Sequence, residues 1–198
     1  TFTVTDNAGQ SAKTSLSVVV QGGIVSTGNL VLSLNPTTPQ TRFVRVSETG
    51  TTPLVTMMVF DLKAENQDAR VSSISINANT DGENISSMVK AWDLYKGNCP
   101  TDGSNQGTFD NCGLLAGGSV ISQGTTASSI DFNNLAYPIA VGNKSTFTIK
   151  AMFADEDDFT AGPDSTAVVQ LSPTGIKAVN QVNFQPVTVS GSTVIGGK

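Results

Sequence analysis

Apolar and polar residues alternate over short distances along most of the chain, which is the pattern of β-strands. The stretches 70–77, 88–96 and 144–153 alternate in this way, and 54–62 is almost continuously apolar. Because 54–62 is the most apolar stretch, we expect it to lie centrally. Further strands are expected over 29–34, 42–47, 119–122, 130–132, 138–141, 166–171, 176–180 and 186–194. No segment has a sustained 3.6-residue period, so the sequence predicts an all-β fold.

The spacing of the turns favours a sandwich. Residues typical of turns separate the expected strands throughout 29–198, and such a cadence of short strands is typical of an immunoglobulin-like β-sandwich. The range is longer than an immunoglobulin domain of about 100 residues. We attribute part of the excess to two long loops, 97–118 and 154–165.

The first 21 residues predict a β-hairpin of their own. Two alternating runs flank the turn sequence Asp6-Asn7-Ala8-Gly9. A lone hairpin is marginally stable in water, so we expect 1–21 either to end a neighbouring domain or to donate a strand to another subunit. Residues 22–28 then form a linker, and the β-sandwich domain follows over 29–198.

Two resemblances agree with this organisation. The stretch from Phe2 to Gly9, Phe-Thr-Val-Thr-Asp-Asn-Ala-Gly, resembles the last hairpin of PKD-like and related bacterial immunoglobulin-like repeats. The resemblance implies that residue 1 lies inside a domain of a larger modular protein. The succession of core patterns around Phe60, Trp92 and Phe147 resembles β-domains of uncharacterised bacterial envelope proteins, which implies surface location and not an activity.

The two cysteines indicate the compartment. Cys99 and Cys112 flank a stretch rich in turn residues, and a disulfide closing such a loop would stabilise the domain by about 3 kcal/mol. A disulfide in an exposed loop implies export, so we expect an extracellular, cell-surface protein. Two free thiols remain the alternative.

Composition removes several classes of function. Histidine is absent, which excludes Ser-His-Asp triads and imidazole metal sites. The net charge of −5 argues against a nucleic-acid partner. No apolar run approaches the roughly 20 residues of a membrane helix, so we expect no membrane insertion by this segment.

One acidic loop is a candidate metal site. Five carboxylates fall between two expected strands, and Ca²⁺ prefers several oxygen ligands. The residues are Asp155, Glu156, Asp157, Asp158 and Asp164. An EF-hand series is absent, so a solvated acidic loop without metal is the alternative. Ca²⁺ is the only cofactor that the sequence suggests.

Aromatic residues offer a second candidate site. Trp92 shares a strand face with Leu94 and is expected in the core, whereas Tyr95 faces the other way and adjoins the cysteine loop. An aromatic ring at such a rim can stack on a sugar, so Tyr95 is a candidate ligand-binding residue.

Two further chemistries have weaker support. Asp61, Asp93 and Asp131 lie within strands, but their spacing shows no pair of the glycosidase type, so we expect no enzymatic activity. An intramolecular Lys–Asn isopeptide bond would need a buried lysine such as Lys63 or Lys150 beside Asn180 or Asn183.

Together these features predict a structural or adhesive module of a secreted prokaryotic surface protein. An S-layer-like coat, an extracellular filament and an adhesin stalk all fit. Its partners would be neighbouring domains or subunits of the same assembly, and glycans are a further option. The alternative is a carbohydrate- or protein-binding accessory module of a secreted hydrolase.

Overall fold

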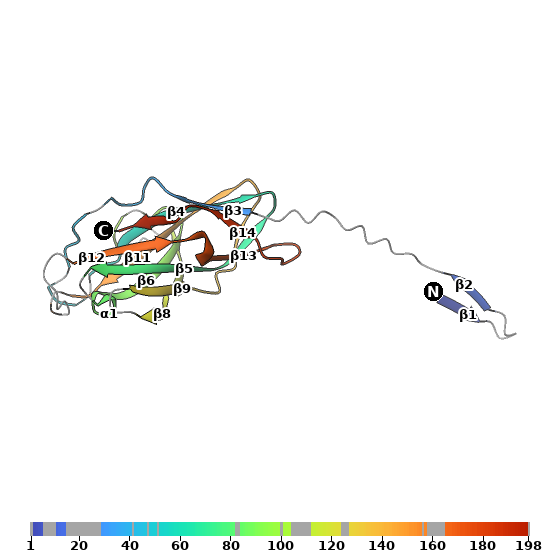
Figure 1. Cartoon of the computed structure of the whole chain (residues 1–198), viewed down its shortest axis with the longest axis horizontal. Coiled ribbons are helices and arrows are strands. Elements are labelled where there is room, and N and C mark those ends of the chain that lie inside the picture. Colours follow the sequence, from blue (N-terminus) through green and yellow to red (C-terminus); the bar gives the residue numbers. More distant parts are fainter. Residues whose placement is uncertain are drawn as a thin grey trace.

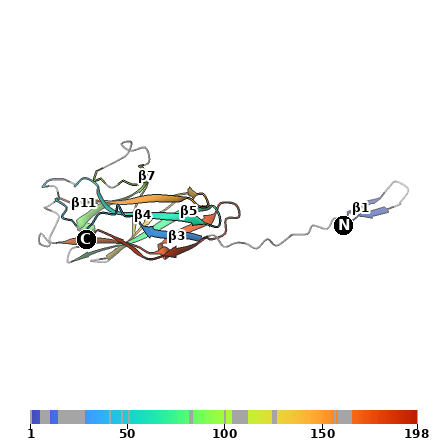
Figure 2. The same cartoon turned by 90° about the horizontal axis from the view of Figure 1, so that it is seen from above.

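The fold is a sandwich of two β-sheets (Figures 1 and 2). The computed structural model describes residues 2–5, 11–14, 29–40, 42–46, 48–50, 52–81, 84–99, 101–103, 112–123, 127–155, 157 and 165–197. Strands make up most of these residues, and the only α-helix among them is a single turn, α1 (Ile85–Met88). The predicted all-β sandwich is confirmed.

The first sheet, here sheet I, has the order β14-β3-β4-β11-β6-β7. All its pairings are antiparallel except that of β14 with β3, which is parallel. The strands in chain order are β3 (Asn29–Leu34), β4 (Val55–Glu65), β6 (Val89–Lys96), β7 (Gly113–Gly117), β11 (Lys144–Phe153) and β14 (Thr188–Gly191).

The second sheet, sheet II, is built around the long strand β5. Its main path is β15-β12-β5-β9-β8, and β10 and β13 also pair with β5. The strands are β5 (Ala69–Asp81), β8 (Ser119–Gln123), β9 (Ala127–Phe132), β10 (Tyr137–Ile139), β12 (Thr166–Leu171), β13 (Ile176–Asn180) and β15 (Val194–Gly196), with a 3-10 helix at Pro173–Gly175 before β13.

Two further strands form a separate hairpin. β1 (Phe2–Thr5) and β2 (Ser11–Thr14) pair antiparallel, with Phe2 opposite Thr14 and Thr5 opposite Ser11. Among the described residues, neither pairs with a strand of sheet I or sheet II. Residues 2–5 and 11–14 thus form a two-stranded sheet, and the rest of the predicted hairpin 1–21 lies outside the described residues.

The core lies between the two sheets. Phe60 of β4 stacks on Phe147 of β11 at 5.4 Å between ring centroids, and Tyr137 of β10 meets Phe147 edge-on at 5.0 Å. Trp92 and Leu94 are buried in the same cluster, as predicted. Residues 55–62 of β4 are buried without interruption, because both faces of this strand are covered.

The structure corrects three predicted elements. Residues 42–46 form no strand, although their alternating sequence favours one. The expected strand 186–194 is divided into β14 and β15, which belong to different sheets, because Gly191 has a φ of +112° that breaks the extended backbone. Inside the predicted loop 97–118, Gly113–Gly117 pairs with β6 as the edge strand β7.

The first and last parts of the sandwich meet in one pair of strands. In the parallel pair, Thr188 lies opposite Asn29 and Gly191 opposite Leu32. Figures 1 and 2 show that β3 begins at one end of the sandwich and that the C-terminus lies at the other. Force applied at the C-terminus acts first on β15, which pairs with β12, and then on β14. Within the parallel pair, force between the two ends of the chain pulls β3 and β14 in opposite directions.

Candidate functional site: a buried polar layer beneath the disulfide loop

The outer face of sheet I carries polar side chains that are buried. Phe147 and Ile149 of β11 belong to the core, so Thr146, Thr148 and Lys150 point to the opposite face. Thr148 and Lys150 nevertheless have no exposed surface, because the disulfide loop, residues 97–112, contributes polar groups directly above them.

Lys150 is the centre of the layer. Its Nζ donates hydrogen bonds to the carbonyl oxygens of Thr101 at 2.6 Å and Gly103 at 2.8 Å, and lies 5.4 Å from the ring centroid of Tyr95. Burial lowers the pKa of Lys150 to about 8, and the negative charge of Asp102 acts in the opposite direction. The ammonium group thus holds two loop carbonyls while its charge is poorly solvated.

A surface ion pair closes the loop over this lysine. Asp102 accepts two hydrogen bonds from the guanidinium group of Arg42, at 2.6 and 2.8 Å, and one from the main-chain nitrogen of Thr56 at 3.0 Å. Burial alone would raise the pKa of Asp102, but these bonds and the charges of Arg42 and Lys150 lower it. The bidentate geometry fixes the loop against the segment before β4.

Threonine hydroxyl groups complete the attachment of the loop. The Thr148 hydroxyl donates to the carbonyl of Gly97 at 2.8 Å and accepts from the main-chain nitrogen of Cys99 at 3.0 Å. The Thr56 hydroxyl donates to the carbonyl of Cys99 at 3.0 Å. The loop is therefore held by side chains of β4 and β11 at several successive residues.

Asp61 organises a second buried cluster on sheet I. The carboxylate, 3% exposed, accepts from Asn35 Nδ2 at 2.9 Å, Lys144 Nζ at 2.9 Å and Thr146 Oγ1 at 2.7 Å. Burial would raise its pKa, but the hydrogen bonds from Thr146, Asn35 and Lys144 together lower it. The cluster attaches the chain that follows β3 to the middle of the sheet.

The predicted disulfide is present, with 5.8 Å between the Cα atoms of Cys99 and Cys112. Both cysteines pack with Leu54 and Tyr95 in a small apolar cluster of their own. Tyr95 does adjoin the cysteine loop, but it is only 2% exposed. The expectation of a ring at an exposed rim is therefore wrong, because Leu54 and the two cysteines pack against Tyr95.

The acidic loop lies only partly within the described residues. Asp155 accepts a hydrogen bond from the main-chain nitrogen of Gly50 at 2.9 Å, and Asp157 is exposed. Glu156, Asp158 and Asp164 lie outside the described residues. Within the described residues, no group of three or more candidate ligands approaches metal-binding geometry. The Ca²⁺ site stays a prediction.

The strand carboxylates are not brought together as a pair. Asp61 and Asp93 lie on β4 and β6 of sheet I, whereas Asp131 lies on β9 of sheet II. Burial raises the pKa of Asp93, opposed by a long hydrogen bond from Tyr95, while the pKa of Asp61 is lowered within its own cluster. Their different partners give no shared site for acid–base chemistry.

The isopeptide hypothesis is not supported by the contacts of its residues. Lys150 is buried, as that bond would require, but its amine faces loop carbonyls. Asn180 ends β13 in sheet II, where its side-chain amide donates to Gln67 and its oxygen accepts from the main chain of Val182 and Asn183. Lysine and asparagine are thus committed to different partners.

One pocket lies near the turn that joins β10 and β11. It has a volume of about 520 Å³ and is lined by Asp68, Pro138, Ile139, Ala140, Asn143, Lys144, Ser145 and Gln181. Asp68 accepts a hydrogen bond from the main-chain nitrogen of Val141 at 2.8 Å, and Lys144 is paired with Asp61. The charged side chains of the pocket are therefore already engaged in holding turns.

Sequence reasoning missed the roles of Asp61, Lys150 and Asp102. The signal for the first two was a charged residue inside a strand that is otherwise rich in apolar residues, since such a charge needs a buried partner. No comparable signal marks Asp102, because a carboxylate in a turn-rich loop is usually solvated. Its pairing with Arg42 depends on a contact across 60 positions of sequence.

Comparisons with known proteins show likeness in structure alone. No protein-family model and no curated protein matches the chain. A chain of a complex between CaDoc0917 and CaCohA2 is 14% identical with a TM-score of 0.34, over 85% of this chain and 97% of that one. A chain of the Coh-OlpC–Doc435 complex, a type I cohesin–dockerin complex from Clostridium thermocellum, is 10% identical with a TM-score of 0.33, over 85% and 90%.

A further solved structure is that of AvmM, described as catalysing macrocyclization in alchivemycin A biosynthesis. It is 8% identical with a TM-score of 0.37, and the likeness covers 85% of this chain and 87% of AvmM. TM-scores in this range carry no argument about binding or catalysis. Among the described residues, no helix is long and apolar enough to cross a membrane.

Proposed function

We propose that the chain is a structural module of a secreted prokaryotic surface assembly, and that it transmits mechanical load along its length. A coat, a filament and an adhesin stalk all require modules of this kind. The Cys99–Cys112 disulfide supports an extracellular location, because such bonds persist in oxidising compartments. The partners are neighbouring domains or subunits of the same assembly.

The parallel pairing of β3 with β14 is the observation that carries this proposal. Asn29 begins β3 at one end of the pair, and Gly191 ends β14 at the other. A force pulling these two ends apart loads all hydrogen bonds of the pair together. Peeling from one end would instead break the bonds one after another, at lower force. The topology therefore resists stretching from end to end.

The covered outer face of sheet I supports the same role. Lys150 and Asp61 hold the disulfide loop and the chain after β3 against strands β4 and β11. The central strands β4 and β11 are thus largely buried on both faces, and β3 pairs directly with β4, so the β3–β14 pair is attached to a well-packed part of the sheet. The disulfide also limits how far the loop can extend when the module is stretched.

Single-molecule pulling in two directions tests the proposal. Handles at the N-terminus and the C-terminus load β15 first and then β3 and β14 in shear. Handles at the N-terminus and at Val182 instead peel the β3–β14 pair from its Asn29 end. Val182 suits this purpose because its side chain is 83% exposed and it precedes β14. We expect the end-to-end geometry to need clearly the higher unfolding force. Equal forces in both geometries would refute the load-bearing role.

The second candidate is an accessory binding module of a secreted hydrolase, and one turn favours it. Residues 181–185 expose Val182 and Phe184, the latter 64% exposed with a φ of +57°. An exposed ring at a turn suits stacking on a sugar or packing on a protein. A pull-down on insoluble polysaccharide tests this candidate, with Val141→Ala as the matched exposed control. Retention that Phe184→Ala abolishes would support it, and no retention would exclude it.

A further inference from the structure

Residues 42–46 have the side-chain pattern of a strand but no strand partner. Val44 and Val46 pack against the core, while Phe43 is 97% exposed and the side chain of Arg45 is 91% exposed. This alternation at period two is that of a β-strand. Among the described residues, none makes a hydrogen bond to the main chain of 43–46. The segment therefore offers free main-chain donors and acceptors beside an exposed aromatic ring.

The hairpin of β1 and β2 has the complementary property. Each strand pairs with the other along one edge only, and among the described residues no third strand completes this sheet. A two-stranded hairpin is marginal in water and gains stability when a further strand is added. Within the described residues there is thus a strand-like segment without a sheet, at 42–46, and a hairpin to which no third strand is added.

The absence of charge in β1 favours it over β2 as the strand that joins 42–46. Arg42 is paired with Asp102 and Arg45 with Glu48, so both arginines of the segment already have a carboxylate partner. β1 contains no charged residue, whereas β2 contains Lys13, which would add a further positive charge beside the two arginines. β1 also has Phe2 and Val4 at alternate positions of its sequence, the pattern of a strand with one apolar face.

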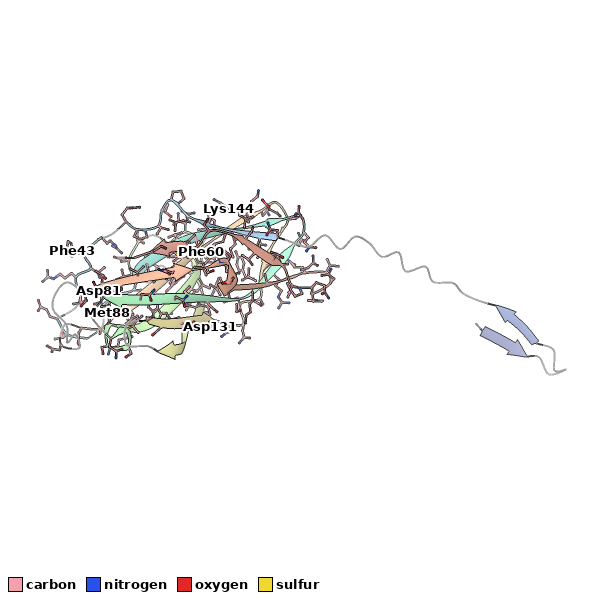
Figure 3. All side chains as sticks on the ribbon, in the orientation of Figure 1. Phe43, Phe60, Asp81, Met88, Asp131 and Lys144 are labelled. Carbon is pink, nitrogen blue, oxygen red and sulfur yellow. A yellow bond between two sulfur atoms is a disulfide. The ribbon has the colours of Figure 1, made fainter. Side chains whose placement is uncertain are left out.

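Residues 42–46 and the start of β3 lie at opposite ends of the sandwich. Figure 3 places Phe43 at the end far from the start of β3, and the hairpin precedes β3 in the sequence. A donor at one end and an acceptor at the other give a head-to-tail contact, which repeats without closing. We propose that β1 of one chain pairs with residues 42–46 of a second copy, so that the modules form a linear polymer. This inference rests on the proposed structural role and names its partner.

Mixing two variants, each of which lacks one side of the contact, tests the pairing with protein that contains residues 1–198. The donor variant, Thr3→Pro/Val4→Pro, removes main-chain donors of β1. The acceptor variant, Phe43→Pro/Arg45→Glu, removes a donor and an apolar contact and reverses a charge, at residues whose side chains are exposed. Val182→Ser/Phe184→Ser is the matched control for loss of exposed apolar side chains elsewhere.

Light scattering at protein concentrations up to about 1 mM gives the readout, because a contact of four or five residues is small and therefore weak. We expect wild-type protein and the control to form species larger than dimers as concentration rises, while each variant alone stays monomeric. An equimolar mixture of the two variants should form a dimer of twice the monomer mass and nothing larger, since only one functional contact exists.

Three results would overturn the pairing. These are monomeric wild-type protein throughout, association of either variant at wild-type strength, and a mixture that stays monomeric. The last would show that β1 of one copy does not pair with residues 42–46 of another. Slower amide exchange at 43–46 in concentrated wild-type protein is the expected independent sign, and unchanged exchange would count against the contact. Pulling experiments on single modules are unaffected by these outcomes, so the load-bearing proposal is judged separately.

Discussion

At the scale of the residue, Lys150 shows how a charged group can organise a β-sheet without serving catalysis. Its side chain is fully buried, yet its amine is matched by two loop carbonyls and an aromatic ring. A buried charge is costly unless hydrogen bonds compensate it. The lysine therefore makes the stability of the module depend on the position of the disulfide loop.

The pH dependence of stability should reveal this lysine. Its pKa is lowered from 10.5 to about 8 by folding, so the unfolded chain binds more protons between these values. The free energy of unfolding should then rise as pH rises from about 8 towards 10.5 through this group. Denaturant unfolding of wild type and Lys150→Met across this range isolates the contribution. Parallel pH profiles for the two proteins would contradict it.

Asp61 should make the free energy of unfolding depend on pH in the acidic range. Replacing it with Asn leaves Lys144 without its partner and sets amide donors against Asn35, so we expect a loss of about 1–3 kcal/mol in unfolding free energy. Because the pKa of Asp61 is lowered by folding, the difference from wild type should shrink as pH falls below 3.8. Asp131→Asn, on sheet II, is the control. A loss no larger than that of the control would be inconsistent with the cluster.

Residue chemistry was only partly predictable from the sequence. The positions of Trp92 and Leu94 in the core followed from strand alternation. Tyr95 was placed at an exposed rim because alternation distinguishes two faces of a sheet but not whether a loop covers the second. The partners of Lys150 could not be predicted for a similar reason, since they are main-chain carbonyls that any residue can provide.

At the scale of the element, the disulfide loop acts as a cover for sheet I. It carries the carbonyls that receive Lys150 and the carboxylate that pairs with Arg42. The loop must be restrained to do so, because a chain of its length has many alternative conformations. The Cys99–Cys112 bond supplies the restraint at both ends.

Removing the bond should loosen the cover as well as destabilise the domain. Cys99→Ser/Cys112→Ser is expected to lower the free energy of unfolding by about 3 kcal/mol. It should also expose Lys150, so that acylation of this amine by an amine-reactive ester, followed by mass spectrometry, becomes faster than in wild type. Exposed Lys63 serves as the internal reference. Acylation of Lys150 at an unchanged rate relative to Lys63 would contradict the covering role.

Most strands could be predicted, and the exceptions have physical causes. The strands that follow their expected ranges are those whose pattern of buried and exposed positions matches the pattern of apolar and polar residues in the sequence. They are β4, β5, β6, β11, β12 and β13. The division of 186–194 into β14 and β15 depends on Gly191, whose left-handed conformation is required where the chain crosses between sheets. Segment 42–46 has a strand sequence without a partner strand, and pairing cannot be read from one segment alone.

At the scale of the whole molecule, the predicted sandwich is confirmed, whereas its connectivity could not have been derived. The parallel contact between β3 and β14 joins residues about 160 positions apart, and their sequences carry no signal of parallel pairing. The partition into a hairpin at 1–21, a linker at 22–28 and a domain from 29 onward stays a prediction.

The predicted Ca²⁺ site can be tested through its effect on thermal stability. If the acidic loop binds Ca²⁺ only when folded, millimolar Ca²⁺ should raise the melting temperature and a chelator should reverse the shift. Asp157→Asn/Asp158→Asn should remove the response, and Mg²⁺ should give a smaller one. A melting temperature unaffected by Ca²⁺ would show that the loop is simply solvated.

The load-bearing role of the β3–β14 pair is the central claim, and Gly191 gives its most direct test. A Cβ at this position would collide with the carbonyl oxygen of Leu32, whereas Gly142, also at positive φ, has open space around it. Gly191→Ala and Gly142→Ala should therefore share backbone strain but differ in their effect on the pair. End-to-end unfolding force should fall markedly for Gly191→Ala and stay near wild type for Gly142→Ala. A wild-type force for Gly191→Ala would contradict the account.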